Sequence, residues 1–96
     1  MANKNDYLAA LRSVIWKLYQ CGAVWEKTVP VHEVFQGKTV WQGDVEVFQA
    51  MQHPKAKRVY AWGYTEGDKT NYTAVLELPP VESPETAVRA AIMRDG

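Results

Sequence analysis

Three residues in the first half of the chain, one histidine and two carboxylates, are of types and at a spacing that could support acid–base catalysis. A three-residue turn at Gly37–Thr39 would fold residues 28–49 into a hairpin that sets His32 opposite Asp44, with Glu46 two residues further along the same face. A carboxylate that orients an imidazole raises its basicity and makes it a general base. Because no nucleophile accompanies these residues at a recognisable spacing, an enzyme is kept as an alternative and we expect a non-catalytic protein.

Cysteine usage and the spacing of metal-ligating residue types argue against a metal or cofactor site. Cys21 is the single cysteine, which excludes an intramolecular disulfide and a cysteine-based zinc site. The sequence holds no His-x-x-x-His or Asp-x-Asp pattern. We therefore expect no metal and no cofactor.

Aromatic residues are abundant for so short a chain, with four Trp, five Tyr and two Phe. Residues 58–65 alternate strictly, so one face of the predicted strand carries an aromatic row, defined as Arg58, Tyr60, Trp62 and Tyr64. Exposed rings in a row usually mark an interface. We favour a homo-oligomer contact, most simply in a dimer. Two other interpretations stay open: coverage by the N-terminal helix or a barrel-like curl of the sheet, and a platform for flat small ligands, sugars or single-stranded bases.

A short basic cluster leads directly into this row. Lys55, Lys57 and Arg58 beside stacking rings are the ingredients of single-stranded nucleic-acid binding, which keeps a nucleic-acid or small-ligand binder as an alternative. However, eleven Lys and Arg balance eleven Asp and Glu, so no overall field attracts a polyanion or an anionic membrane. We expect a solvated loop that blunts the sheet edge, and no nucleic-acid partner.

Residues 6–20 follow a helical period, with an apolar stripe and an N-cap at Asn5 or Asp6. Trp16 lies off this stripe. Either a neighbouring segment packs on Trp16, or it forms a second surface through which a dimer could join. The predicted helix ends at Cys21-Gly22, where glycine suits the position after the last turn.

Two hairpins and a second helix complete the expected elements. In the second hairpin, the turn Glu66–Lys69 has Gly-Asp at its centre and pairs Val59, Ala61 and Gly63 with Leu76, Ala74 and Tyr72. This small-residue face is the one that a helix can approach closely. In the first hairpin, Gln42-Gly43-Asp44 is a competing turn signal, so a bulge or a further turn at Gly43 is an alternative to a regular strand. The second helix begins at Ser83-Pro84-Glu85, packs through Val88, Ala91 and Ile92, and pairs Glu85 with Arg89.

Glu33 is an anomaly in this scheme because the register places it between Val31 and Phe35 on the core face. A buried carboxylate needs a partner, for which His53 or Lys27 is available. Alternatively, the register differs and Glu33 faces solvent.

Together these elements predict a two-layer α+β fold in the order α-β-β-β-β-α, with both helices on one face of an antiparallel sheet and the other face uncovered. The 96 residues predict a single domain, 1–96. The first residues form no secretory h-region, and no apolar run is long enough for a membrane span. With its lone cysteine, this predicts a cytoplasmic protein that does not engage a membrane.

Overall fold

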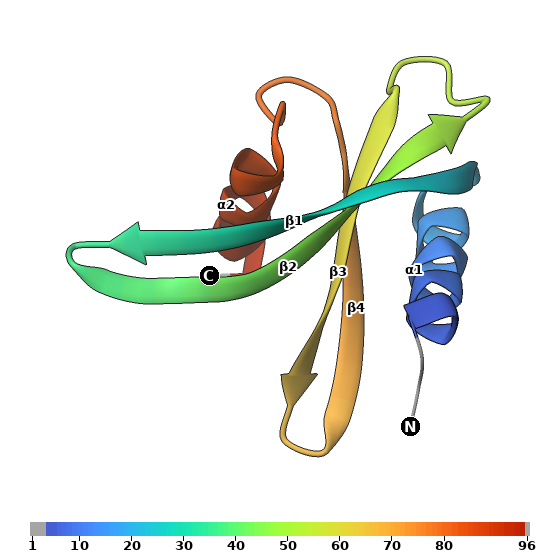
Figure 1. Ribbon diagram of the computed structural model, residues 1–96. Coiled ribbons are helices and arrows are strands. Elements are labelled where there is room, and N and C mark those ends of the chain that lie inside the picture. Colours follow the sequence, from blue (N-terminus) through green and yellow to red (C-terminus); the bar gives the residue numbers. More distant parts are fainter. Residues whose placement is uncertain (1–3, 96) are drawn as a thin grey trace.

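The computed structural model describes residues 4–95 and contains the six expected elements in the expected order (Figure 1). They are α1 (Lys4–Tyr19), β1 (Gly22–Phe35), β2 (Lys38–Met51), β3 (Arg58–Glu66), β4 (Lys69–Leu76) and α2 (Pro84–Asp95). The strands form one antiparallel sheet in the order β1-β2-β3-β4. The α+β class is therefore confirmed, while the predicted domain 1–96 includes residues 1–3 and 96, which lie outside the described residues.

The β3–β4 hairpin has the predicted register throughout. Gly63 pairs with Tyr72, and the two-residue turn lies at Gly67 and Asp68 between Glu66 and Lys69. Gly67 has a φ of 64°, which suits a turn with glycine at its first central position. Local turn chemistry and strict alternation were thus sufficient to predict the register of this hairpin.

The β1–β2 hairpin has a different register from the predicted one. Its turn consists of Gln36 and Gly37, both with positive φ, and Phe35 therefore pairs with Lys38. A register irregularity between Glu33 and Val34 follows, after which Glu33 lies opposite Trp41. Relative to the expected pairing, β2 is displaced by two residues between Thr28 and Glu33, and by three residues at Val34 and Phe35 next to the turn. Because side chains alternate with period two, the even displacement keeps the side chains of residues 28–33 facing the predicted side of the sheet.

The expectation that both helices cover one face is wrong. On β3, Val59 and Ala61 pack with Leu8, Leu11 and Ile15 of α1, whereas Tyr60 and Trp62 pack with the second helix. These residue pairs alternate along the strand, so α1 and α2 lie on opposite faces of the sheet, as Figure 1 also shows. Both faces of β3 are apolar, so each face needs its own covering layer, and one helix supplies that layer on each side.

The helix ends agree with their sequences at α2 and differ at α1. The Ser83 hydroxyl accepts a 3.2 Å hydrogen bond from the Thr86 amide, which confirms the predicted N-cap. At the end of α1, Gln20, with a positive φ of 56°, occupies the position after the last turn where glycine was expected, and Gly22 instead begins β1. No helix among the described residues is long and apolar enough to cross a membrane.

The two hairpins separate in the middle of the sheet. The β2–β3 ladder runs from Gln49↔Arg58 to Glu46↔Ala61 and ends there, although both strands continue. In Figure 1 the β1–β2 hairpin then crosses in front of α2 towards the left of the view, while β3 and β4 run towards the bottom. Residues 38–45 of β2 and 62–66 of β3 are thus not paired with each other.

Candidate functional site

The structure does not build the predicted histidine–carboxylate pair. His32 pairs with Gln42, and its Nε2 lies 2.6 Å from the Thr39 hydroxyl, while Asp44 pairs with Pro30. The cause is the two-residue displacement of β2 at this position, which results from the turn at Gln36 and Gly37 together with the register irregularity between Glu33 and Val34. The expected cross-strand contact between His32 and Asp44 is therefore wrong.

Glu46, the third candidate of that group, is a buried structural residue. It is 2% exposed and accepts hydrogen bonds from the Lys4 ammonium at 3.0 Å, the Trp25 indole at 2.9 Å and the Thr28 hydroxyl at 2.5 Å. Lys4 also lies 5.7 Å from the Trp25 ring centroid. These contacts tie the start of α1 to β1 and β2 and leave little carboxylate surface for a ligand.

The aromatic row is covered within one chain, so its expected exposure is wrong at the two central rings. Tyr60 is 3% and Trp62 2% exposed, because α2 packs on them through Val88 and Ala91. The covering helix is the C-terminal one, not the N-terminal helix that was considered as an alternative. Tyr64, at the end of the row, remains exposed.

The basic end of the row is neutralised by carboxylates. The Arg58 Nε lies 3.2 Å from Glu26, and its Nη1 lies 3.9 Å from Glu77. The hydrogen bond and charge of Glu26 raise the pKa of Arg58. Lys55 and Lys57 are exposed on the loop before β3. The predicted basic cluster therefore presents two lysines, while its arginine is part of an ion-pair network.

Trp16 is exposed on α1, at 56%. The packing of a neighbouring segment on this ring, which was one of the two expectations, is therefore wrong. Its use as a contact surface stays a prediction.

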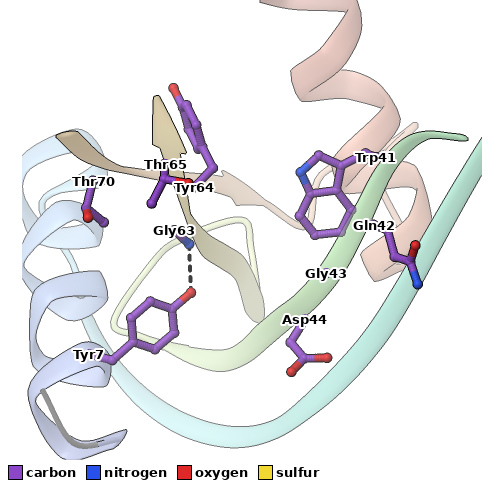
Figure 2. A pocket seen from close by; sticks show the side chains of 9 residues that line it. All are labelled: Tyr7, Trp41, Gln42, Gly43, Asp44, Gly63, Tyr64, Thr65 and Thr70. Carbon is purple, nitrogen blue, oxygen red and sulfur yellow. Dashed lines mark hydrogen bonds between the residues drawn. The ribbon is translucent and has the colours of Figure 1, made fainter. Parts of the chain in front are cut away.

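The separation of β2 from β3 opens a cleft of about 490 Å³ between the strands. We call it the β2–β3 cleft. Figure 2 shows Tyr7 reaching in from α1 and Trp41 and Asp44 on β2, across from Gly63 and Tyr64 on β3. The volume falls within the range of ligand sites. The cleft is lined by Tyr7, Trp41, Gln42, Gly43, Asp44, Gly63, Tyr64, Thr65 and Thr70.

Backbone groups of both strands point into this cleft. The Gly63 amide donates a 2.7 Å hydrogen bond to the Tyr7 hydroxyl, as Figure 2 shows. In an antiparallel pair alternate residues bond to a given neighbour, so Gly63 and Thr65 direct their backbone groups to the same side, away from β4. By the same alternation, Gln42 and Asp44 continue the β2 edge that bonds to β3 at Glu46.

Tyr7 and Tyr19 belong to the apolar stripe of residues 6–20, which predicted a role in the core and gave no sign of a role at strand edges. Tyr19 donates a 2.7 Å hydrogen bond to the Ala74 carbonyl of β4. Burial raises the pKa of both tyrosines, and the Gly63 amide partly offsets that effect at Tyr7. Their place on the apolar stripe of α1 could not reveal these bonds, because the strand edges are set by tertiary structure.

A second concave surface, of about 460 Å³, lies between the tip of the β1–β2 hairpin and α2. Glu33 is buried there and accepts a hydrogen bond from Arg89. Its placement on the core face is thus confirmed, but the expected partners His53 and Lys27 are wrong, and Arg89 does not make the expected ion pair with Glu85. The apolar tip surface consists of Val34, Phe35, Val40, Ile92 and Met93.

Among the described residues, no group of three or more His, Cys, Asp or Glu side chains is arranged to hold a metal ion. Every buried side-chain nitrogen or oxygen in that part of the chain has a hydrogen-bond partner. The open backbone edges of the β2–β3 cleft are therefore the best candidate site. No family model matches the chain, and neither a curated protein nor a solved structure shows significant similarity to it.

Proposed function

We propose that this protein is a non-catalytic interaction module that takes up an extended polypeptide segment in the β2–β3 cleft. The observation that carries the proposal is the end of the β2–β3 ladder at Glu46↔Ala61 while both strands continue. Unpaired strand edges are templates for another strand, and main-chain hydrogen bonds then supply the affinity.

The chemistry of the cleft supports a peptide over a compact ligand. Peptide amides and carbonyls match the backbone donors and acceptors of Gln42, Asp44 and Thr65. The rings of Trp41 and Tyr64 give the segment apolar contact at either strand. The Tyr7 hydroxyl is the hydrogen-bond partner of one strand amide, Gly63, so a group other than a strand of the sheet bonds to this edge of β3, which supports the proposal.

A test blocks one strand edge with proline, which has no amide hydrogen. Gln42 and His32 lie opposite each other, and by alternation the Gln42 amide faces the cleft while the His32 amide faces the free edge of β1. Pro30 already occupies that free edge two residues earlier. Gln42→Pro should therefore weaken peptide binding, and His32→Pro is its matched control.

The probe is an array of ten-residue extended peptides of apolar, basic, acidic and neutral patterns, with fluorescence anisotropy on the peptides that bind. We expect Gln42→Pro to weaken binding about fivefold or more, because one hydrogen bond contributes about 1 kcal/mol. N-methylation of alternate peptide amides should weaken binding as well. Failure of all patterns to bind, or equal binding by both proline variants, would contradict the proposal.

A second candidate function is self-association through the apolar tip surface. Phe35 and Met93 are 65% and 80% exposed, and the two charged groups beside them, Glu33 and Arg89, neutralise each other. The surface has both a protruding ring and a concave part, which suits contact with a second copy across a two-fold axis. A formal net charge of zero adds no repulsion between copies.

Light scattering after size exclusion tests this dimer. The wild-type protein should have a mass about twice the 10.9 kDa of one chain, and the Phe35→Glu variant should have the mass of one chain. Trp16→Ser is the control for the other surface that the sequence suggested. A monomer at all concentrations rules out the dimer, and dissociation by Trp16→Ser alone would assign the contact to α1.

A further inference from the structure

The β2–β3 cleft continues on the other face of the sheet as a second cavity. That cavity, of about 460 Å³, is lined by Trp41, Trp62, Tyr64, Thr65, Thr73, Val88, Ala91 and Ile92. Trp41, Tyr64 and Thr65 line both spaces. A strand lying between β2 and β3 would thus have one cavity on each of its faces. We call the space that Tyr7 of α1 lines the α1-side cavity, and the space that Val88 of α2 lines the α2-side cavity.

The α1-side cavity is more polar than the α2-side cavity and has one negatively charged residue in its lining. Tyr7, Thr65 and Thr70 contribute hydroxyl groups, and Asp44 has the only charge among the described residues that line it. Lys4, at the start of α1, is bonded to Glu46 at 3.0 Å. The exposed Asp44 carboxylate contributes to the raised pKa of Tyr7, after burial, Glu46 and Tyr72.

The α2-side cavity is apolar. Trp41 and Trp62 meet edge to face with ring centroids 5.8 Å apart, and Val88 and Ile92 of α2 complete the wall. At its edge, Arg94 donates a hydrogen bond to the Thr73 hydroxyl at 3.2 Å. No residue among those described as lining this cavity is charged.

Successive side chains of a strand point to opposite faces, so a bound segment would place alternate residues in the two cavities. We propose that the polypeptide bound by the β2–β3 cleft alternates apolar residues, which enter the α2-side cavity, with lysine or arginine residues, which approach Asp44. This inference rests on the proposed function, because it specifies the sequence class of the segment bound at the same site.

The test uses four capped peptides labelled with fluorescein, measured by anisotropy against the full chain. One alternates Lys with Val, one Glu with Val and one Gln with Val, and the fourth holds the same Lys and Val residues in two blocks. We expect the Lys-Val alternating peptide to bind at least tenfold more tightly than the Glu-Val peptide and the block peptide. Replacement of Val by Ser should also weaken binding at least tenfold.

Asp44→Asn should bring the affinity for the Lys-Val peptide close to that for the Gln-Val peptide, and Asp68→Asn, in the exposed β3–β4 turn, is the matched control. Equal binding of the Lys-Val and Glu-Val peptides, or of the alternating and block peptides, overturns the inference and leaves the proposed function standing. Equal peptide affinities of Asp44→Asn and Asp68→Asn also overturn the inference and leave the proposed function standing. Failure of all four peptides and of the wider array overturns both.

Discussion

The Tyr7 hydroxyl accepts a 2.7 Å hydrogen bond from the Gly63 amide at the point where β3 has separated from β2. Glycine at this position allows the close approach, because a Cβ there would lie 3.0 Å from the Tyr7 ring and 3.1 Å from Tyr72. A side chain of α1 thus replaces a strand as the partner of a strand amide.

Tyr7→Phe removes this hydrogen bond while it keeps the ring. We expect the free energy of unfolding to fall by about 0.5–1.5 kcal/mol, the usual contribution of one hydrogen bond. Urea unfolding followed by tryptophan fluorescence measures the loss. Tyr64→Phe, at an exposed tyrosine of the same cleft, is the control and should change stability by less than about 0.5 kcal/mol. Equal effects would mean that the Tyr7 bond does not contribute to stability.

Glu46→Ala should destabilise the fold by about 1.5–3 kcal/mol or more, because it leaves the Trp25 indole and the Thr28 hydroxyl without their acceptor. Glu46→Gln preserves an oxygen acceptor and should have a smaller effect. Thermal unfolding of both variants tests the order. A larger loss for glutamine than for alanine would contradict the role of Glu46 as a shared acceptor.

Glu33 and Arg89 should be energetically coupled. Arg89→Met leaves a buried carboxylate without its partner, and we expect a loss of about 1–3 kcal/mol. This is below the 3–5 kcal/mol of a fully buried pair because Arg89 is largely exposed and water screens the interaction. In a double-mutant cycle, Glu33→Gln with Arg89→Met should lose less stability than the sum of the single changes. Additive losses would refute the coupling.

Stability should decrease in alkaline solution. Burial and the hydrogen bond to Glu77 raise the pKa of Tyr60 above its ordinary value of 10.0. A raised pKa in the folded state means that the unfolded chain ionises first, so the stabilising contribution is complete below about pH 10 and is lost as the pH rises through the folded pKa. Urea midpoints between about pH 9 and 11 test this. Tyr60→Phe should reduce the slope, and an unchanged slope would assign it to other tyrosines, such as Tyr7 and Tyr19.

Local signals in the sequence determined most of the secondary structure. Strict alternation and the Gly67-Asp68 turn were sufficient for the register of β3 with β4, and the Ser83-Pro84 start was sufficient for α2. These features depend on residues that are neighbours along the chain or across one short turn. The face of the side chains at residues 28–33 of the first hairpin was also predictable, because the displacement of β2 is even there.

The tertiary structure alone decided which face each helix covers and where the sheet opens. Both faces of β3 are apolar, so residues 58–62 could not indicate that α2 would bury Tyr60 and Trp62 while α1 took the opposite face. The β2–β3 cleft arises because two regular hairpins separate after Glu46↔Ala61, a relationship between segments that no local pattern encodes. The sequence determined that the rings of the aromatic row share one face; packing by the second helix decided that the central rings belong to the core and that the site lies at the open strand edges.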